Sequence, residues 1–368
     1  MTGIGPLDEF PVHQLPLPAG WAGTSDRNFY DRCYFNAHDR SGKLFLVTGL
    51  GYYPNLGVKD AFALLRRGGE QTAVHLSDEI GAERLNQFVG AYRIEVTEPL
   101  RRLRLVLEET EGIAFDLTWQ GSFAPVQEQP HVLRAGNRIT LDAQRFAQVG
   151  TWEGTLLVDG EETAVTPDTW VGTRDRSWGI RPVGEPEPPG RPQDPPMEGF
   201  WWLYAPLRFE DFAVVVIIQE EPDGFRTVND AVRVWADGRV EQLGWPRVSI
   251  TYAPGTREAT GAVLRGTTAR GEDVTIEVEP LIGAVLHVGA GYSPDPDWTH
   301  GQWKGAAFTE RVRYQMDDPA VAPRIPFGVT DYAARARCGT AEGYGLFEHA
   351  SLGRHDPSGF TGWESVAP

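Results

Sequence analysis

The residues of this sequence best suited to chemistry lie in one short stretch, GTRDRSWGIRP, from Gly172 to Pro182. The stretch places an acid, Asp175, between Arg174 and Arg176, with Trp178 close by. In a β-strand the side chains alternate, so both arginines and Trp178 would share one face and Asp175 would point to the other. Buried charges are costly unless they are paired or functional. Two interpretations stay open: a buried ion pair in which Asp175 holds the arginines, or the wall of a site.

A second concentration of candidate residues is FWWLYA, at positions 200–205. In a strand, Phe200, Trp202 and Tyr204 share one face and the intervening residues point to the other. A large core explains part of this pattern. Aromatic rings just after a cationic strand also suit an apolar pocket with a few polar groups, the usual form of a small-molecule site. Stacked rings could in addition stabilise a passing carbocation.

The elements that must position these residues are predicted to be β-strands. Short runs of β-forming residues alternate with turn signals over most of the 368 residues, which is typical of an all-β, antiparallel architecture. The length predicts two domains, at residues 1–181 and 198–368. Between them, residues 182–197 hold seven prolines and three acids and are predicted to form a stiff connector. Short helices are expected at Asp78–Phe88 and Asp142–Val149.

Composition limits the classes of partner. The formal charge of -17 argues against nucleic acids and anionic membrane surfaces. No apolar run is long enough to span a bilayer and no signal peptide is recognisable, so a cytoplasmic location is expected. The chain has two cysteines and eight scattered histidines, without a nucleotide-binding or zinc motif. We therefore expect neither a metal nor another cofactor.

Two motifs resemble those of a known family. GTRDRSWG resembles the RDHSWG-type motif of the lipocalin-like family that contains hydroxyneurosporene synthase (a carotenoid hydratase), kievitone hydratase and fungal decalin-forming cyclases. DRCYFNAH, Asp31–His38, is similar to the EWWYFxGH strand of that family and keeps Tyr34, Phe35 and His38, but it lacks the tryptophan pair and the acid. The resemblance implies two lipocalin-like β domains packed side by side, with an apolar ligand in or between them.

The resemblance also suggests a type of reaction. Hydratases of the family are thought to protonate an alkene and capture the cation with water. Asp175 and Trp178 match the motif, but Arg176 replaces its histidine. A permanently charged arginine is a poor proton donor, although it can bind a carbonyl or carboxylate oxygen. The Tyr-x-Asp motif of the carotenoid hydratases has no match, because Trp202 and Tyr204 stand there without an acid. Cyclase, isomerase or lyase chemistry on an oxygen-bearing apolar substrate is therefore expected.

Roles can be predicted for the individual residues. The arginines should lower the pKa of Asp175 and keep it ionised as an anchor, which leaves Tyr204 as the expected proton-transfer group. The predicted catalytic residues are Tyr204, Asp175 and Arg176. The predicted ligand contacts are Tyr34, Tyr53, Trp119, Trp178, Trp202 and Glu348.

The polar residues outside these motifs carry weaker signals. Glu128, near His131 in a proline-flanked loop, is expected to be solvated, and Glu348, beside His349, can also be read as an edge-strand charge.

Three functions remain open on the sequence alone. The first is a cofactor-independent enzyme, a hydratase/lyase, cyclase or isomerase acting on a terpenoid- or polyketide-like molecule. The second is a non-catalytic lipocalin-like protein that binds a hydrophobic ligand. The third is a structural module in which RDRSWG forms an ion-pair knot between domains. A hydrophobic small molecule is the expected partner, and a homodimer stays open.

Overall fold

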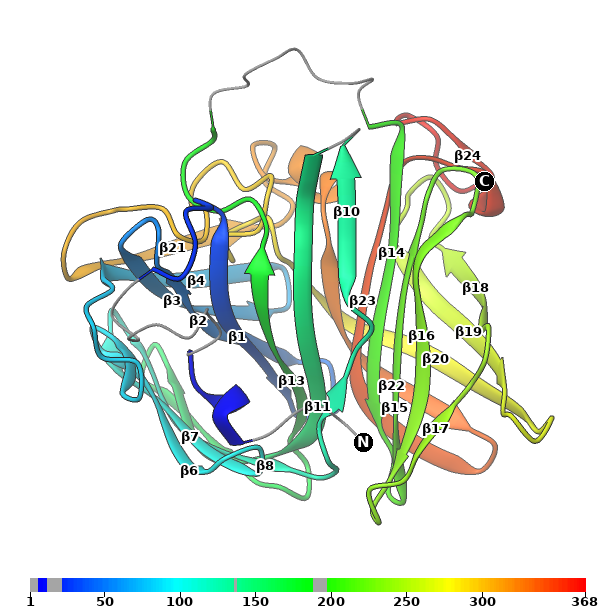
Figure 1. The fold of residues 1–368 in the computed structure, drawn as a ribbon, viewed down its shortest axis with the longest axis horizontal. Helices are drawn as coiled ribbons and strands as arrows, with labels where there is room; N and C mark the ends of the chain where they lie inside the picture. The colour runs from blue at the N-terminus through cyan, green and yellow to red at the C-terminus, as the bar shows by residue number, and fades with distance from the viewer. Residues whose placement is uncertain (1–5, 12–21, 136–137, 188–196) are drawn as a thin grey trace.

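The computed structural model describes residues 6–11, 22–135, 138–187 and 197–368, and these form two curled antiparallel β-sheets that lie side by side (Figure 1). This arrangement confirms the predicted all-β class with two lipocalin-like β domains. The described helical segments are short 3-10 turns: η1 (Pro6–Glu9), η2 (Ala322–Phe327) and η3 (Asp356–Ser358). Within the described residues no helix is long and apolar enough to cross a membrane.

The first sheet contains 14 strands. Its main path runs in the order β21 (Phe308–Gln315), β4 (Glu70–Glu79), β3 (Val58–Arg67), β2 (Leu44–Tyr53), β1 (Phe29–His38), β13 (Val171–Ile180), β11 (Arg138–Val158), β8 (Ile113–Gly121), β7 (Arg102–Thr110), β6 (Tyr92–Glu98) and β5 (Gln87–Val89). The long strand β11 also pairs with β9 (Val126–Gln127), β10 (His131–Ala135) and β12 (Glu161–Val165).

The second sheet contains ten strands. Its main path runs in the order β17 (Val240–Gln242), β16 (Arg226–Trp235), β15 (Phe212–Glu220), β14 (Gly199–Arg208), β23 (Ala341–His355), β22 (Thr330–Cys338), β20 (Asp273–Val285), β19 (Ala259–Thr267) and β18 (Arg247–Tyr252). The short strand β24 (Phe360–Thr361) pairs with β23.

One strand crosses the predicted division of the chain. β21 follows the second-sheet strand β20 in sequence, but it pairs with β4 at the edge of the first sheet. The first sheet therefore contains strands from both sides of residues 182–197, whereas all described strands of the second sheet follow them. The domain boundaries themselves stay a prediction, because residues 188–196 of the predicted connector lie outside the described part of the chain.

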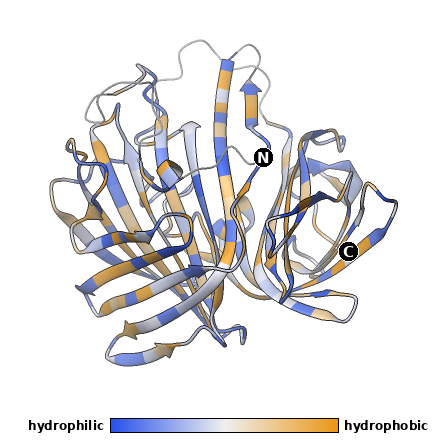
Figure 2. Ribbon diagram, turned by 60° about the horizontal axis from the view of Figure 1, so that its bottom comes forward, coloured by the Kyte–Doolittle hydropathy of each residue, from blue (hydrophilic) through white to orange (hydrophobic). Residues whose placement is uncertain are grey.

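Among the described residues, hydrophobic side chains form three large clusters and two smaller ones. One core fills the first sheet around Phe35, Trp119 and Trp152, and another fills the second sheet around Leu203 and Phe347. A third cluster joins the sheets, since first-sheet residues such as Tyr34 pack with second-sheet residues such as Trp202. Apolar and polar residues alternate along many of the strands (Figure 2), as expected when a strand buries its two faces differently.

Both helix predictions are wrong. The segment predicted as Asp78–Phe88 contains the end of β4, a turn through Gly81 at φ 61°, and part of β5. Two of its three large apolar residues, Leu85 and Phe88, are exposed and only Ile80 packs against the core, so a helix would have little buried face to stabilise it. Residues 142–149 belong to β11, where they pair with β13.

Candidate functional site

The GTRDRSWG stretch is the central strand β13, between β1 and β11. Glycine allows the three strands to approach closely at its start. A Cβ atom on Gly172 would lie 1.9 Å from the carbonyl oxygen of Asn36 on β1. The predicted alternation holds, because Asp175 and Ser177 line a cavity while Arg174 and Arg176 point to the opposite face. One strand thus separates two environments.

The arginine face of β13 is structural. Arg174 donates hydrogen bonds of 2.6 and 2.9 Å to the carboxylate of Glu9, and a third of 2.8 Å to Gln148. Arg176 donates to the carboxylate of Asp31 at 2.9 Å and to the side-chain oxygen of Gln87 at 3.0 Å. Both guanidinium groups are almost fully buried. The buried ion-pair interpretation is therefore correct for the arginines, but their partners are Glu9 and Asp31 rather than Asp175.

The opposite face of β13 forms part of a cavity of about 180 Å³ between the two sheets. One wall comes from alternate residues of β1, β13 and β11 together with β10, and the other comes mainly from β14 and β23. Figure 1 shows β10 and β11 facing β14 where the sheets meet. The lining residues are Tyr30, Arg32, Tyr34, Glu128, Gln129, His131, Leu133, Leu141, Ala143, Arg145, Asp175, Ser177, Arg181, Phe200, Trp202, Tyr292, Val329 and Glu348.

Four of the predicted site residues meet in this cavity. Tyr34 and Asp175 lie directly opposite each other on β1 and β13, and Trp202 and Glu348 come from β14 and β23 of the second sheet. Phe200 stacks on Trp202 with ring centroids 6.3 Å apart, so that the second wall is largely aromatic. Residues far apart in sequence thus provide an acid, a phenol and an aromatic surface in one enclosed space.

The other five predicted site residues do not line the cavity. Arg176 points to the opposite face of β13, as described above, and the partly buried Trp178 shares that face. Trp119 is part of the first-sheet core. Tyr53 donates a 3.0 Å hydrogen bond to the buried Asp60. Tyr204 is buried between the sheets on the same face of β14 as Trp202, where its ring packs under the guanidinium group of Arg145 at 4.6 Å.

The pKa of Asp175 shifts in the direction opposite to the one predicted from the sequence. Burial raises the pKa of its carboxyl group to about 6, although the charges of Arg145 and Arg32 oppose that rise. The expectation of a lowered pKa is wrong because the two neighbouring arginines in sequence lie on the other face and are neutralised there. Within the described residues, no hydrogen bond reaches the Asp175 carboxyl group. It is an acid that can gain or lose a proton near neutral pH.

Glu128 is not solvated, contrary to the sequence expectation. It is 4% exposed and accepts a 2.6 Å hydrogen bond from Nε of Arg145. Burial raises the pKa of Glu128 to about 7, against the lowering effect of Arg145. The adjacent His131 stacks on Trp202 with centroids 5.4 Å apart, and burial lowers the pKa of His131 to about 4. The histidine therefore contributes a neutral ring to the wall.

Glu348 belongs to an interior strand, since β23 lies between β14 and β22, so the edge-strand interpretation is wrong. Its carboxylate accepts a hydrogen bond from the indole Nε1 of Trp202. Its register partner on β22 is Asp331, whose pKa is raised well above the usual range by burial and by the charge of Glu348. Tyr34 donates a 2.5 Å hydrogen bond to Asp331. These contacts fix the orientation of the aromatic wall.

Comparisons with known proteins place this fold and this chain. A model of a protein family of unknown function, DUF8625, matches residues 4–361. The chain belongs to the DUF8625 family. A comparison with curated proteins finds no match to the sequence.

The fold of this DUF8625 protein is similar to several solved structures. A protein assigned as an AttH from Nitrosomonas europaea is 14% identical with a TM-score of 0.54, over 92% of this chain and 98% of that one. CghA, in a structure with Sch210972, is 12% identical with a TM-score of 0.53, over 95% and 96% of the two chains. Kievitone hydratase from Nectria haematococca is 14% identical with a TM-score of 0.49, over 87% and 88%.

These likenesses, at identities far too low to carry a function, show the fold alone. The matches to the AttH protein and CghA confirm the expected fold resemblance, so that this DUF8625 chain is a distant member of the same fold family.

Sequence reasoning missed five cationic or phenolic residues of the cavity, of which Tyr30 lies on β1 two residues before Arg32. Arg32 alternates with Tyr34 on β1, so the period-two pattern could have identified it. Arg145 was hidden by the incorrect helix prediction. Arg181 follows β13 directly, and Tyr292 comes from a loop after β20, for which no local sequence signal exists.

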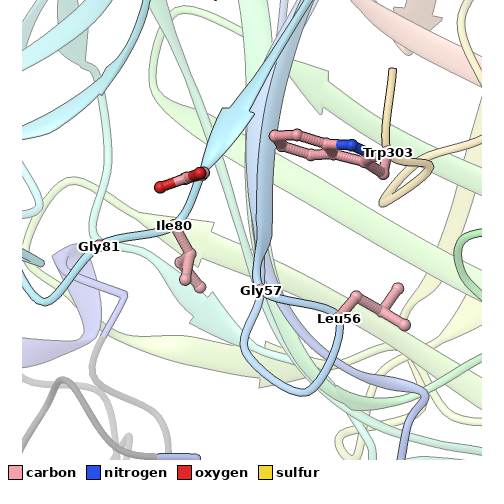
Figure 3. Close-up of a pocket in the computed structure, with 6 residues that line it drawn as sticks. Leu56, Gly57, Ile80, Gly81 and Trp303 are labelled. Carbon is pink, nitrogen blue, oxygen red and sulfur yellow. The ribbon is translucent and has the colours of Figure 1, made fainter. Parts of the chain in front are cut away.

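A second pocket lies at the surface of the first sheet, beside the turn between β2 and β3 (Figure 3). Its volume is about 380 Å³, and its large apolar groups are Leu56, Ile80 and Trp303. Glu79 is the one ionisable residue among those that line it. None of the predicted site residues belongs to this pocket, so it adds no candidate chemistry to that of the cavity between the sheets.

Proposed function

We propose that the cavity between the two sheets binds an apolar, oxygen-bearing small molecule, and that the protein transforms it by proton transfer without a cofactor. Asp175 is the proton-transfer group of this proposal. The observation that carries it is a carboxyl group without a hydrogen-bond partner among the described residues, with a pKa raised to about 6, directed into a cavity walled by aromatic rings.

Physical chemistry favours Asp175 over Tyr204 for this task. A general acid or base works best when its pKa lies near the working pH. The phenol of Tyr204 is buried, and its pKa is raised well above its usual range by that burial and by nearby carboxylates. It does not line the cavity. In our proposal Tyr204 therefore supports Arg145 through ring contact, and Asp175 exchanges the proton.

The walls suit a ligand of mixed character. Trp202 and Phe200 offer apolar rings, while Tyr34 and Arg32 offer polar groups on the opposite wall. Aromatic walls with a few placed polar groups are usual for small-molecule sites. CghA, which has a similar fold, has been solved with Sch210972, which supports a ligand-holding role for this fold.

The chemistry that fits is acid–base isomerisation, cyclisation, or addition and elimination of water. In each case Asp175 would give a proton to an oxygen or carbon of the ligand and recover one from the ligand or from water. No electron acceptor or donor is required, because proton transfer leaves the overall oxidation state unchanged.

The test is proton exchange in heavy water. Wild-type protein is incubated in D₂O with a panel of apolar ketones, enones and dienes, and each compound is examined by mass spectrometry for a new product or for incorporated deuterium. We expect at least one compound to react with wild type and not with Asp175→Asn. Reaction retained in Asp175→Asn would contradict the role of Asp175. Binding without chemistry in wild type would instead indicate a carrier.

A further inference from the structure

Two arginines at one end of the cavity lack a carboxylate partner among the described residues. The Arg32 side chain is buried, with a residue exposure of 5%, and its hydrogen bond goes to the Tyr292 hydroxyl at 2.9 Å. The guanidinium group of Arg32 also lies 4.6 Å from the centroid of the Tyr292 ring. Arg181, which is partly buried, lies 5.4 Å from the same ring and 5.3 Å from the ring of Tyr30. Both arginines line the cavity.

The neighbouring arginines show how this fold neutralises a buried guanidinium group that has a structural role. Arg174 is paired with Glu9 at 2.6 Å and Arg176 with Asp31 at 2.8 Å, both on the opposite face of β13. The third cavity arginine, Arg145, is paired with Glu128 at 2.6 Å. Arg32 and Arg181 differ from these three because aromatic rings surround them where carboxylates would be expected.

The two guanidinium groups beside the Tyr292 ring repel each other, although each gains from its own contact with the ring. Burial and the charge of Arg32 lower the pKa of Arg181, whereas the pKa of Arg32 is raised overall because nearby tyrosines and Asp175 outweigh its burial. Among the acids that line the cavity, Asp175 is the nearest to Arg32 in the register of β1 and β13. It forms no ion pair within 4.0 Å with Arg32 or Arg181 in the described structure. Unfavourable polar arrangements of this kind are characteristic of functional sites.

We propose that Arg32 and Arg181 bind a carboxylate group of the ligand, so that the molecule taken up is an apolar carboxylic acid in its ionised form. This inference rests on the proposed function. It adds a carboxylate group to the small molecule whose apolar part, in that proposal, contacts Trp202. Guanidinium groups bind carboxylates through short, charge-assisted hydrogen bonds, often in pairs, which suits a forked donor such as Arg32. The Tyr292 hydroxyl holds Arg32 in place for this contact.

Binding of the ligand carboxylate would also change the protonation state of Asp175. The positive charges of Arg32 and Arg181 favour the ionised form of Asp175. A bound anion offsets those charges, so Asp175 holds its proton more firmly when the ligand is present. The ligand would thereby convert the cavity acid into the protonated form that a general acid requires.

The test uses pairs of probes that differ in charge but hardly in shape: trans-cinnamate with cinnamamide, and 2-naphthoate with 2-naphthamide. Dissociation constants are measured by calorimetry at pH 7.5 for wild type, Arg32→Gln and Arg181→Gln. Arg104→Gln is the matched control, because Arg104 forms exposed ion pairs on the first sheet and does not line the cavity. Melting temperatures confirm that each variant is folded.

We expect wild type and Arg104→Gln to bind each carboxylate roughly ten-fold or more tightly than its amide, the scale of one hydrogen bond to a charged group. Arg181→Gln should remove most of that preference while its melting temperature stays equal or rises, because a like charge has been removed. Arg181→Gln thus keeps the test decisive even if Arg32→Gln does not fold. Equal affinities for carboxylate and amide in wild type would overturn the carboxylate inference and leave the proposed function intact. If no probe of either kind binds, the proposed apolar-ligand site fails and the inference fails with it.

Discussion

Tyr34 and Asp175 are register partners on β1 and β13, and both side chains face the cavity between the sheets. The next residues along each strand, Phe35 and Arg174, point the other way. Phe35 lies in the first-sheet core, and Arg174 binds Glu9. The central strand therefore has a structural face and a ligand face, and substitutions on the two faces should have opposite consequences.

On the structural face, Glu9→Gln should strongly destabilise the protein. Although burial alone would raise the pKa of Glu9, Arg174 lowers it overall, so the pair is ionised in the folded state. Removal of one partner leaves a buried, uncompensated guanidinium group, at a cost of about 3–5 kcal/mol. Urea denaturation measures this loss, with the exposed Glu210→Gln as the control. A loss for Glu9→Gln no greater than that of the control would show that the Glu9–Arg174 pair contributes little.

On the ligand face, Asp175→Asn should leave stability unchanged or raise it by up to about 3 kcal/mol at pH 7. The folded pKa of Asp175, about 6, lies above the unfolded value, so its ionisation costs stability as pH rises from about 4 to 6. The advantage of Asp175→Asn over wild type should therefore grow across that range and level off above it.

Titrating groups that do not sense the charge of Asp175 cancel in this comparison, and His131, with its pKa lowered to about 4, is one of them. The pKa of Glu128 is raised to about 7 by burial and, to a smaller extent, by the charge of Asp175, so it should be somewhat lower in Asp175→Asn. Melting curves from pH 4 to 8 measure the difference between Asp175→Asn and wild type. A difference that runs in the other direction, with Asp175→Asn losing stability above pH 6, would mean that the Asp175 carboxylate has a stabilising partner.

The division of β13 into a structural face and a ligand face was largely predictable from the sequence, because it depends only on the alternation of side chains along a strand. The period-two pattern of residues 172–182 separates Asp175 from the arginines without any knowledge of the fold. The same pattern does not identify Glu9 as the partner of Arg174, since the two are 165 positions apart and meet only through tertiary structure. It also does not reveal that Arg145 faces the cavity, because residues 142–149 fit a helical pattern as well as a strand.

Tyr204→Phe distinguishes the two candidates for proton transfer. The Tyr204 hydroxyl is buried and has no hydrogen-bond partner among the described residues, so its removal should not lower stability and could raise it by about 1 kcal/mol. With a reactive compound in hand, Tyr204→Phe should keep its turnover within a few-fold of wild type. Turnover for Asp175→Asn should instead fall by roughly 10²-fold or more. A folded, inactive Tyr204→Phe beside an active Asp175→Asn would restore the proton-transfer role to Tyr204.

Trp202→Ala should weaken ligand binding by about 1–3 kcal/mol, the usual loss for a buried aromatic contact at a binding site. Trp202→Phe should recover part of that loss because it keeps the stacking with Phe200 and His131. It cannot recover all of it, since the indole hydrogen bond to Glu348 is gone. Calorimetric titration measures the affinities, with the exposed Trp245→Ala as control. Equal losses for Trp245→Ala and Trp202→Ala would place the ligand elsewhere.

The central claim is that Asp175 is a cavity acid able to exchange a proton near neutral pH. The most direct measurement is an NMR titration of the aspartate side-chain carboxyl carbons from pH 3 to 9, with the Asp175 signal assigned by its absence in Asp175→Asn. The account predicts a midpoint near 6 for Asp175. It also predicts a higher midpoint when a bound carboxylate offsets Arg32 and Arg181. A midpoint at or below the ordinary aspartate value of about 3.9 would show an ionised anchor and contradict the account.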